Sequence, residues 1–240
     1  MVFGGIQKLT LIDYPEKTAC TLFTIGCNFN CPFCQNSSLI DITAGERPVQ
    51  NKYEISETEV LKFLETRKGL LDGVCISGGE PLIQDELEGF IKKVKTLGFS
   101  IKLDTNGSNP QKLEKLVTSG AISNVAMDIK NSPEKYALTI GIPGYDVSPV
   151  QESVSFLLSN TVPYEFRTTV VKEFHIENDL LAIVNWISGA ENYFIQGFND
   201  SDGVLYSGLN GYSDDEMNGL LNSIKNVLPS AKLRGVPEKN

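Results

Sequence analysis

The sequence predicts an α/β protein built as a partial, open (β/α)6 barrel. Runs rich in β-branched and aromatic residues alternate with helix-like runs about six times, with strands expected at 18–25, 72–77, 99–104, 122–128, 164–171 and 192–197. This alternation predicts a parallel sheet with right-handed crossovers, and six units are fewer than the eight of a closed barrel. We expect one domain over 1–240, with 1–17 as an N-terminal strand or arm and 229–240 as a polar tail, in which 232–235 could add an edge strand.

Helix and loop signals fill the intervals between these strands. Two capping boxes, Ser56–Glu59 and Ser213–Glu216, predict helix starts, and Asn178 is expected to cap a further helix. Residues 41–55 are polar, and residues 131–150 are rich in proline and glycine. Both segments are therefore expected to be loops.

Composition and charge argue against membrane-spanning, disulfide-rich secreted and broadly nucleic-acid-binding classes of protein. The chain has 240 residues, a net charge of −9, and no apolar run long enough to span a bilayer or to resemble a signal peptide. Three of its five cysteines lie close together, which argues against a secreted disulfide framework and favours a cytoplasmic, reducing setting. The negative charge argues against broad nucleic-acid binding. The single histidine, His175, and Cys75 in the second strand are expected to be structural core residues.

Three cysteines follow the first predicted strand. Cys27, Cys31 and Cys34 have the spacing C-x3-C-x2-C and are expected on one loop. Clustered thiolates bind soft metals or iron–sulfur clusters. A structural zinc ion needs four protein ligands, whereas three thiolates leave one iron of a four-iron cluster open to another ligand. Structural zinc with a distant fourth ligand, and simple packing of the thiols, remain alternatives at this point.

Glycines and polar residues follow three of the other strands, where β/α barrels place their sites. Gly78-Gly79-Glu80-Pro81 comes directly after the second strand, and paired glycines let the main chain approach a ligand closely. Asp104 and Asp128 occupy corresponding positions at the ends of the next two strands. The alternatives are a simple strand-to-helix turn for the glycines and caps or turns for the aspartates.

The C-x3-C-x2-C motif with the later Gly-Gly-Glu-Pro segment resembles the radical S-adenosylmethionine (radical SAM) superfamily. The resemblance implies a [4Fe–4S] cluster on Cys27, Cys31 and Cys34, with SAM on the open iron. It also implies that Glu80 favours the SAM ammonium group. The implied cofactor-binding residues are Gly78, Gly79, Glu80, Asp104, Thr105, Asn106, Asp128, Lys130, Arg167 and Gln196. In some members, groups corresponding to Asp104, Thr105 and Asp128 hold a monovalent cation.

Two shorter segments resemble anaerobic ribonucleoside-triphosphate reductase activating proteins, a group of glycyl-radical activating enzymes. These are Thr10–Pro15 and Cys34-Gln35-Asn36, although that group more often has glycine where this chain has Glu16. The resemblance implies reductive cleavage of SAM and abstraction of a hydrogen atom from a glycine of the partner reductase, with flavodoxin or ferredoxin as electron donor. A chain little longer than the family's core, with an open barrel mouth, suits a loop of a large partner. The alternatives are a radical SAM enzyme acting on a small molecule, peptide or modified nucleobase, and a zinc-stabilised binding module.

Overall fold

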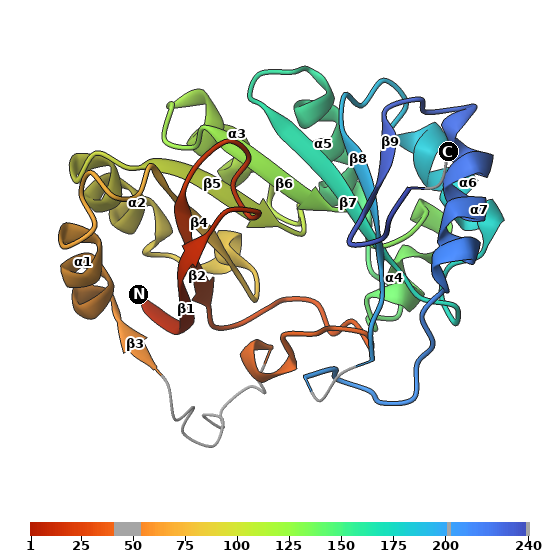
Figure 1. Ribbon diagram of the computed structural model, residues 1–240, viewed down its shortest axis with the longest axis horizontal. Coiled ribbons are helices and arrows are strands. Elements are labelled where there is room, and N and C mark those ends of the chain that lie inside the picture. Colours follow the sequence, from red (N-terminus) through yellow and green to blue (C-terminus); the bar gives the residue numbers. More distant parts are fainter. Residues whose placement is uncertain (41–53, 201–202, 239–240) are drawn as a thin grey trace.

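One curved sheet of nine strands forms the centre of the protein, with the helices on its outer side (Figure 1). The computed structural model describes residues 1–40, 54–200 and 203–238. The strand order is β3-β1-β2-β4-β5-β6-β7-β8-β9. The strands are β1 (Val2–Thr10), β2 (Ala19–Thr24), β3 (Ile55–Ser56), β4 (Gly73–Gly78), β5 (Ser100–Thr105), β6 (Asn124–Asp128), β7 (Tyr164–Val170), β8 (Tyr193–Gly197) and β9 (Ala231–Arg234).

The sheet confirms the predicted fold class. The six predicted strands correspond to β2 and β4–β8, and each pairs in parallel with its neighbour. A seventh parallel strand, β9, pairs with β8 and lies in the segment predicted as a tail with an edge strand. At the other end β1 runs antiparallel to β2, and β3 runs antiparallel to β1. Because β3 and β9 are the two ends of the strand order, the barrel is open.

Helices cover the outer face of the sheet through amphipathic packing. They are α1 (Glu57–Glu65), α2 (Leu87–Thr96), α3 (Pro110–Thr118), α4 (Tyr136–Thr139), α5 (Ser148–Leu158), α6 (Glu177–Trp186) and α7 (Asp214–Lys225), with 3-10 turns η1 (Ser37–Leu39), η2 (Pro81–Ile83) and η3 (Pro133–Lys135). Outward strand residues such as Leu22, Ile76 and Leu103 are fully buried in this layer. Each such side chain contributes about 1.5–3 kcal/mol to stability. The inner side of the sheet is thus left free to carry polar groups.

Helix starts follow the predicted capping boxes in two cases and differ in a third. Ser56 and Ser213 cap α1 and α7, each paired reciprocally with the glutamate three residues later. The prediction for Asn178 is wrong, because α6 already begins at Glu177. The side chain of Asp179 accepts a hydrogen bond from the backbone N–H of Ile176 at 2.9 Å and so satisfies the first turn.

The loop prediction for residues 131–150 is wrong in part. This segment contains η3 and α4, and α5 begins at Ser148. The prolines that suggested a loop include Pro133 and Pro149, which lie in the first turns of η3 and α5. Proline is well tolerated there, because the N–H that it lacks would have no helical partner. Of the other predicted loop, residues 41–53 lie outside the described part of the chain, and the prediction is wrong at Ile55, which pairs with Phe3 in β3.

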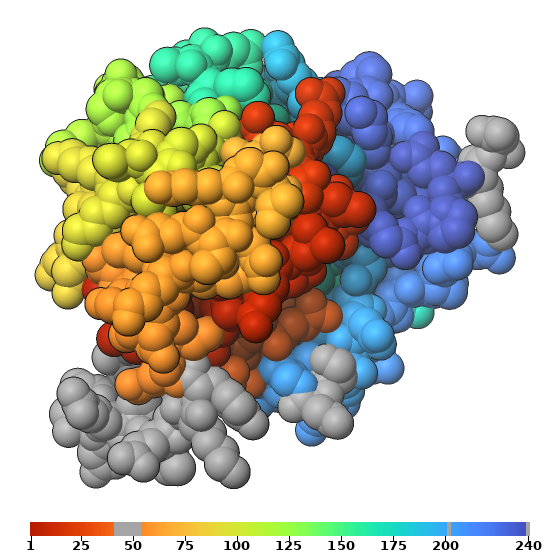
Figure 2. All heavy atoms as spheres, turned by 60° about the vertical axis from the view of Figure 1, so that its left-hand side comes forward, coloured from red at the N-terminus to blue at the C-terminus, as the bar shows by residue number. Residues whose placement is uncertain are grey.

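The N-terminal arm forms β1 and then turns to lead into β2. In the view of Figure 2 its residues lie between the segment around 54–100 and the C-terminal residues. Tyr14 is buried and its hydroxyl lies 3.0 Å from the hydroxyl of Ser123. Glu16 has φ +60°, in the left-handed region that favours glycine. Glycine at this position in the resembling proteins therefore has a conformational explanation.

Two predicted core residues are confirmed. Cys75 and His175 both have no exposed surface. The Nε2 atom of His175 lies 2.7 Å from the carbonyl oxygen of Lys130, so the ring fastens the segment after β6 to the segment after β7. Among the described residues, no helix is long and apolar enough to cross a membrane.

Candidate active site

The cysteine loop begins at Gly26, directly after β2, and two phenylalanines anchor it. Phe29 packs edge-on against Tyr145 at a centroid distance of 5.2 Å, and Phe33 packs against Phe174 at 5.6 Å. Both phenylalanines are at least 95% buried. Because they alternate with the cysteines in the sequence, their burial fixes the loop around the three thiols.

Backbone hydrogen bonds tie this loop to two neighbouring segments. The N–H of Asn30 donates to the carbonyl of Ile140, and the N–H groups of Leu205 and Tyr206 donate to the carbonyls of Cys34 and Pro32, at 3.0–3.1 Å. Burial raises the pKa of Cys27 to about 11 and that of Cys31 to about 12. Both thiols are therefore protonated near neutral pH unless a cation stabilises the thiolate.

The glycine pair after β4 allows that strand to meet the cysteine loop. A Cβ atom on Gly79 would lie 1.9 Å from the carbonyl oxygen of Gly26, and one on Gly78 would lie 2.3 Å from the backbone nitrogen of Thr24. Gly78 also has φ +115°. The N–H groups of Gly79 and Glu80 donate to the carbonyls of Thr24 and Gly26. No side chain fits at either glycine without a backbone shift.

Glu80 is fully buried beneath this junction and joins two loops. Its Oε1 accepts hydrogen bonds from the N–H of Leu82 (3.0 Å) and the hydroxyl of Thr105 (2.7 Å), and its Oε2 accepts one from the N–H of Asn106 (2.6 Å). Burial raises the pKa of Glu80 to about 7, although the three hydrogen bonds act in the opposite direction. The amide of Asn106 continues the chain of contacts by donating to Asn28, next to the first cysteine.

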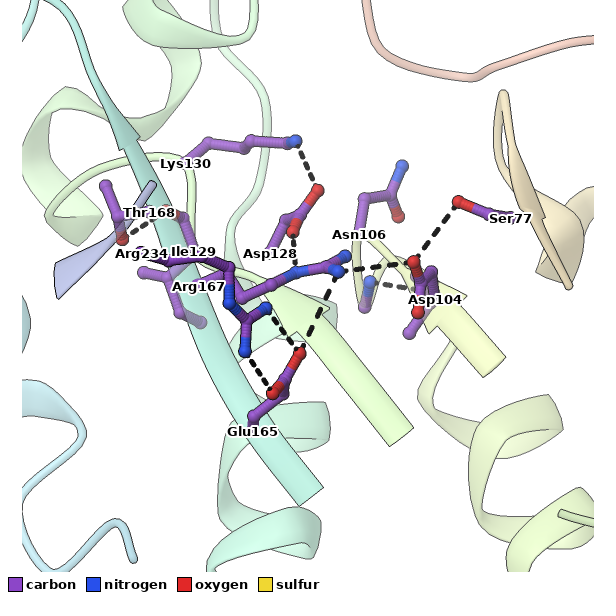
Figure 3. Close-up of polar contacts among 12 residues, drawn as sticks. Ser77, Asp104, Asn106, Asp128, Ile129, Lys130, Glu165, Arg167, Thr168 and Arg234 are labelled. Carbon is purple, nitrogen blue, oxygen red and sulfur yellow. Dashed lines mark hydrogen bonds and ion pairs between the residues drawn. The ribbon is translucent and has the colours of Figure 1, made fainter. Parts of the chain in front are cut away.

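Arg167 on β7 bridges the two aspartates predicted at the site (Figure 3). Its Nε donates to Oδ1 of Asp128 at 2.9 Å, and one terminal nitrogen donates to Oδ2 of Asp104 at 3.2 Å. Lys130 pairs with the other oxygen of Asp128 at 2.9 Å, and Lys102 pairs with Asp104 at 2.6 Å. These ion pairs join the ends of β5, β6 and β7 into one network.

The network holds its members in the charged form. Burial acts to raise the pKa of Asp104 and Asp128, but the neighbouring cations outweigh it and lower both pKa values. Burial likewise opposes the charge on Lys130, yet Asp128 raises its pKa above the ordinary range. The guanidinium of Arg167 provides the positive charge between the two carboxylates. The hydroxyl of Thr105 is engaged by Glu80, and a monovalent cation at Asp104, Thr105 and Asp128 stays a prediction.

A cavity of about 380 Å³ brings every predicted site residue together. Its walls include the predicted residues Cys27, Cys31, Cys34, Gly78, Gly79, Glu80, Asp104, Thr105, Asn106, Asp128, Lys130, Arg167 and Gln196. Sequence reasoning missed further lining residues, among them Asp13, Ser77 and Thr169. Strand alternation could have found Thr169, which lies two residues after Arg167 and so faces the same side. Asp13 lies within the arm, where its Oδ2 accepts a hydrogen bond from Thr21 at 2.6 Å.

The chemistry of this lining fits an iron–sulfur cluster with a polar ligand beside it. Three thiols from one loop supply soft donors, and the paired cations and carboxylates lie in the same cavity. The cavity volume falls within the usual range of small-ligand sites, about 300–1,000 Å³. Within the described residues, no three Cys, His, Asp or Glu side chains converge on the position of a single metal ion.

Comparison with known proteins agrees with this chemistry. Residues 21–187 match the family model described as the radical SAM superfamily. A Methanocaldococcus jannaschii protein named as a candidate glycyl-radical enzyme activating enzyme is 30% identical over 203 residues, covering 83% of this chain and 80% of that protein. A pyruvate formate-lyase-activating enzyme of Listeria monocytogenes is 33% identical over 140 residues, covering 55% and 54% of the two chains.

Other relatives carry different names. A Thermococcus kodakarensis protein named as a probable GTP 3′,8-cyclase is 26% identical over 153 residues, covering 62% of this chain and 46% of its own. Among solved structures, Streptococcus suis SuiB bound to S-adenosylmethionine superposes with a TM-score of 0.67 at 12% identity, covering 88% of this chain and 49% of SuiB. That likeness shows a shared fold.

Proposed function

Because the chain belongs to the radical SAM superfamily, we propose that it activates a glycyl-radical enzyme, with SAM as the co-substrate. Superfamily membership implies a [4Fe–4S] cluster and SAM. When bound, the reduced cluster and SAM supply a carbon-centred radical able to abstract a hydrogen atom. The substrate is a glycine in a partner protein, and we propose anaerobic ribonucleoside-triphosphate reductase as that partner.

We assign each group of cavity residues a role in this chemistry. Cys27, Cys31 and Cys34 hold the cluster, and the buried phenylalanines of the same loop fix their positions. Glu80 lies in the wall of the cavity and ties the loops after β4 and β5 together by three hydrogen bonds. Arg167 and Lys130, with their paired aspartates, orient the polar groups of SAM. Gln196 borders the same cavity from β8.

The charge of the cavity is the observation that supports a peptide substrate. Its described lining contains two cations, Lys130 and Arg167, and both are already paired with carboxylates. The same lining contains four carboxylates, those of Asp13, Glu80, Asp104 and Asp128. A nucleoside triphosphate needs unpaired cations to offset its phosphates. The described lining therefore disfavours a triphosphate substrate such as that of a GTP cyclase.

Amide side chains provide what a peptide backbone requires. The described lining includes the carboxamides of Asn36 and Gln196, and those of Gln35 and Asn106, which also hydrogen-bond within the protein to Asn199, Asn28 and Ser108. Each carboxamide offers both a donor and an acceptor, as a peptide group does. The Methanocaldococcus jannaschii relative, which aligns with this chain over 80% of its own length, is named as an activating enzyme. That name supports the same substrate class. The choice of the reductase as partner is supported by Thr10–Pro15 and the Cys-Gln-Asn segment.

The test combines the anoxically reconstituted protein with SAM, a reductant and the reductase, and measures the glycyl radical by electron paramagnetic resonance. We expect a radical with wild-type protein, and none with a Cys31→Ala variant or with a reductase whose target glycine is alanine. A full yield of 5′-deoxyadenosine with no radical on the reductase would refute the assignment of the reductase as the partner. Flavodoxin and ferredoxin can be compared with dithionite in the same assay as proposed physiological donors.

A further inference from the structure

The last strand adds a charged side chain to the network beneath the cavity. Arg234 of β9 makes two parallel hydrogen bonds to Glu165 of β7, at 2.9 and 2.7 Å (Figure 3). Its guanidinium also lies over the ring of Phe194 of β8, 3.9 Å from the centroid. Neither Arg234 nor Glu165 lines the cavity. The pair of hydrogen bonds and the ring contact fix the guanidinium more tightly than one ion pair would.

Three cationic side chains lie within 4 Å of the Glu165 carboxylate. Its Oε1 lies 2.9 Å from Arg234, 3.9 Å from Lys102 and 3.9 Å from the terminal nitrogen of Arg167 that bonds Asp104. The side chain of Glu165 is 8% exposed and that of Lys102 is fully buried, so solvent screens these charges little. The position of the Glu165 carboxylate therefore influences where the Arg167 guanidinium lies.

We propose that Arg234 is a positioning residue that acts through Glu165 to hold Arg167 in the geometry that binds SAM. The inference rests on the proposed function, because it takes the cavity beside Arg167 as the SAM site. Arg234 holds Glu165 by two hydrogen bonds, which keeps its carboxylate 3.9 Å from Arg167 and leaves that guanidinium free to bridge the two aspartates. Without Arg234, Glu165 moves toward Lys102 and Arg167 and draws the guanidinium away from Asp104.

The strand that carries Arg234 is itself held in register. Arg234 lies opposite Gln196 in the pairing of β9 with β8, and Gln196 lines the cavity. The carboxylate of Glu238 accepts a hydrogen bond from the N–H of Leu233 at 3.1 Å, and the carbonyl of Pro237 accepts one from Asn218 of α7 at 3.0 Å. The C-terminal segment thus secures the register that places Arg234 under the network.

The test measures the dissociation constant of SAM for the reconstituted holoprotein, using labelled SAM in equilibrium dialysis. We expect Arg234→Gln to raise this constant about tenfold, by analogy with outer groups that orient metal ligands, whose loss typically costs a factor of 10–100 in affinity or activity. Lys232→Gln is the matched control, because Lys232 lies on the same strand and also over Phe194, at 5.8 Å. It should bind SAM as the wild type does. Iron content and the thermal midpoint are measured on every variant. Arg234→Gln should keep the wild-type iron content, while its thermal midpoint falls because the buried Glu165 carboxylate loses its ion-pair partner.

A variant cycle distinguishes positioning from a general loss of structure. In a Glu165→Gln background, a further Arg234→Gln change should alter SAM binding less than twofold, because its effect passes through Glu165. If Arg234→Gln does not fold, Arg234→Lys decides, with an expected loss of about threefold from the missing second hydrogen bond. Wild-type affinity in a folded Arg234 variant, or an undiminished effect in the Glu165→Gln background, would overturn the proposal. Failure of the wild type itself to bind SAM would instead overturn the proposed function, and this inference with it.

Discussion

Replacing Glu80 by glutamine is expected to destabilise the fold by an amount that depends on pH. The buried carboxylate faces three donors, from Leu82, Thr105 and Asn106. A glutamine amide has only one acceptor oxygen, so its NH2 group must face at least one of these donors. One buried donor left unsatisfied costs about 1–3 kcal/mol. At about 2–4 °C per kcal/mol for a chain of this size, a loss of about 2 kcal/mol lowers the thermal midpoint by about 4–8 °C at pH 8.

The pH dependence follows from the raised pKa of Glu80. Burial raises it from an ordinary value of 4.5 to about 7, so between these values the folded protein binds more protons at Glu80 than the unfolded chain does. The part of the Glu80 contribution to stability that is linked to protonation is therefore largest at low pH and is lost as pH rises through about 7. The wild type should exceed Glu80→Gln by about 2–3 kcal/mol more at pH 5 than at pH 8.

The assay is thermal unfolding of the anoxically reconstituted proteins, followed by circular dichroism from pH 5 to pH 8. Glu114→Gln, at an exposed position of α3, is the matched control and should unfold with the wild type at both ends of the range. A constant difference between wild type and Glu80→Gln across the range would refute the role of burial. It would mean that the three hydrogen bonds keep Glu80 ionised throughout.

Three further substitutions test the local geometry. Gly79→Ala should destabilise the fold by about 2–3 kcal/mol in thermal unfolding, because its Cβ would lie 1.9 Å from a backbone carbonyl oxygen. The control Gly89→Ala, on the open face of α2, should stabilise the fold by up to about 1 kcal/mol. Equal effects of the two substitutions would contradict the packing argument. Glu16→Gly should leave stability unchanged or raise it by up to about 1 kcal/mol. A residue with a side chain pays about 1–2 kcal/mol for φ +60°, and glycine avoids this cost but increases the conformational entropy of the unfolded chain, which offsets part of the gain. A clear loss of stability in chemical denaturation would contradict this prediction. Cys31→Ala should abolish stable binding of iron and sulfide, as measured by chemical analysis. The control Cys20→Ala removes a core thiol of β2 and should still bind iron and sulfide. Loss of iron in both variants would indicate a general packing defect.

Local sequence patterns predicted the parallel strands β2 and β4–β8 and many of the residues that line the cavity. Hydrophobic runs located β2 and β4–β8, and in a parallel sheet the segments that follow the strands gather at one edge. For that reason Cys27, Gly78, Asp104 and Asp128, although far apart in sequence, could be assigned to one site. Resemblance to a known family then selected among the chemistries that these residue types allow.

Side-chain partners could not be predicted, because they depend on distances between strands. Arg167 bridges Asp104 and Asp128 only because three neighbouring strands align in register. Glu80 was expected to attract a ligand ammonium by charge, yet its carboxylate is fully buried beneath the junction of two loops. No periodicity in the short segment around Arg234 indicated that it would reach Glu165.

The most direct test of the central claim is SAM cleavage by the protein itself. The protein is purified without oxygen, reconstituted with iron and sulfide, and supplied with SAM and dithionite, and 5′-deoxyadenosine is measured with and without the partner reductase. We expect 5′-deoxyadenosine from the wild type and none from a variant with alanine at Cys27, Cys31 and Cys34. A wild-type protein that holds iron and sulfide but yields no 5′-deoxyadenosine under either condition, or one that holds only zinc, would contradict the claim.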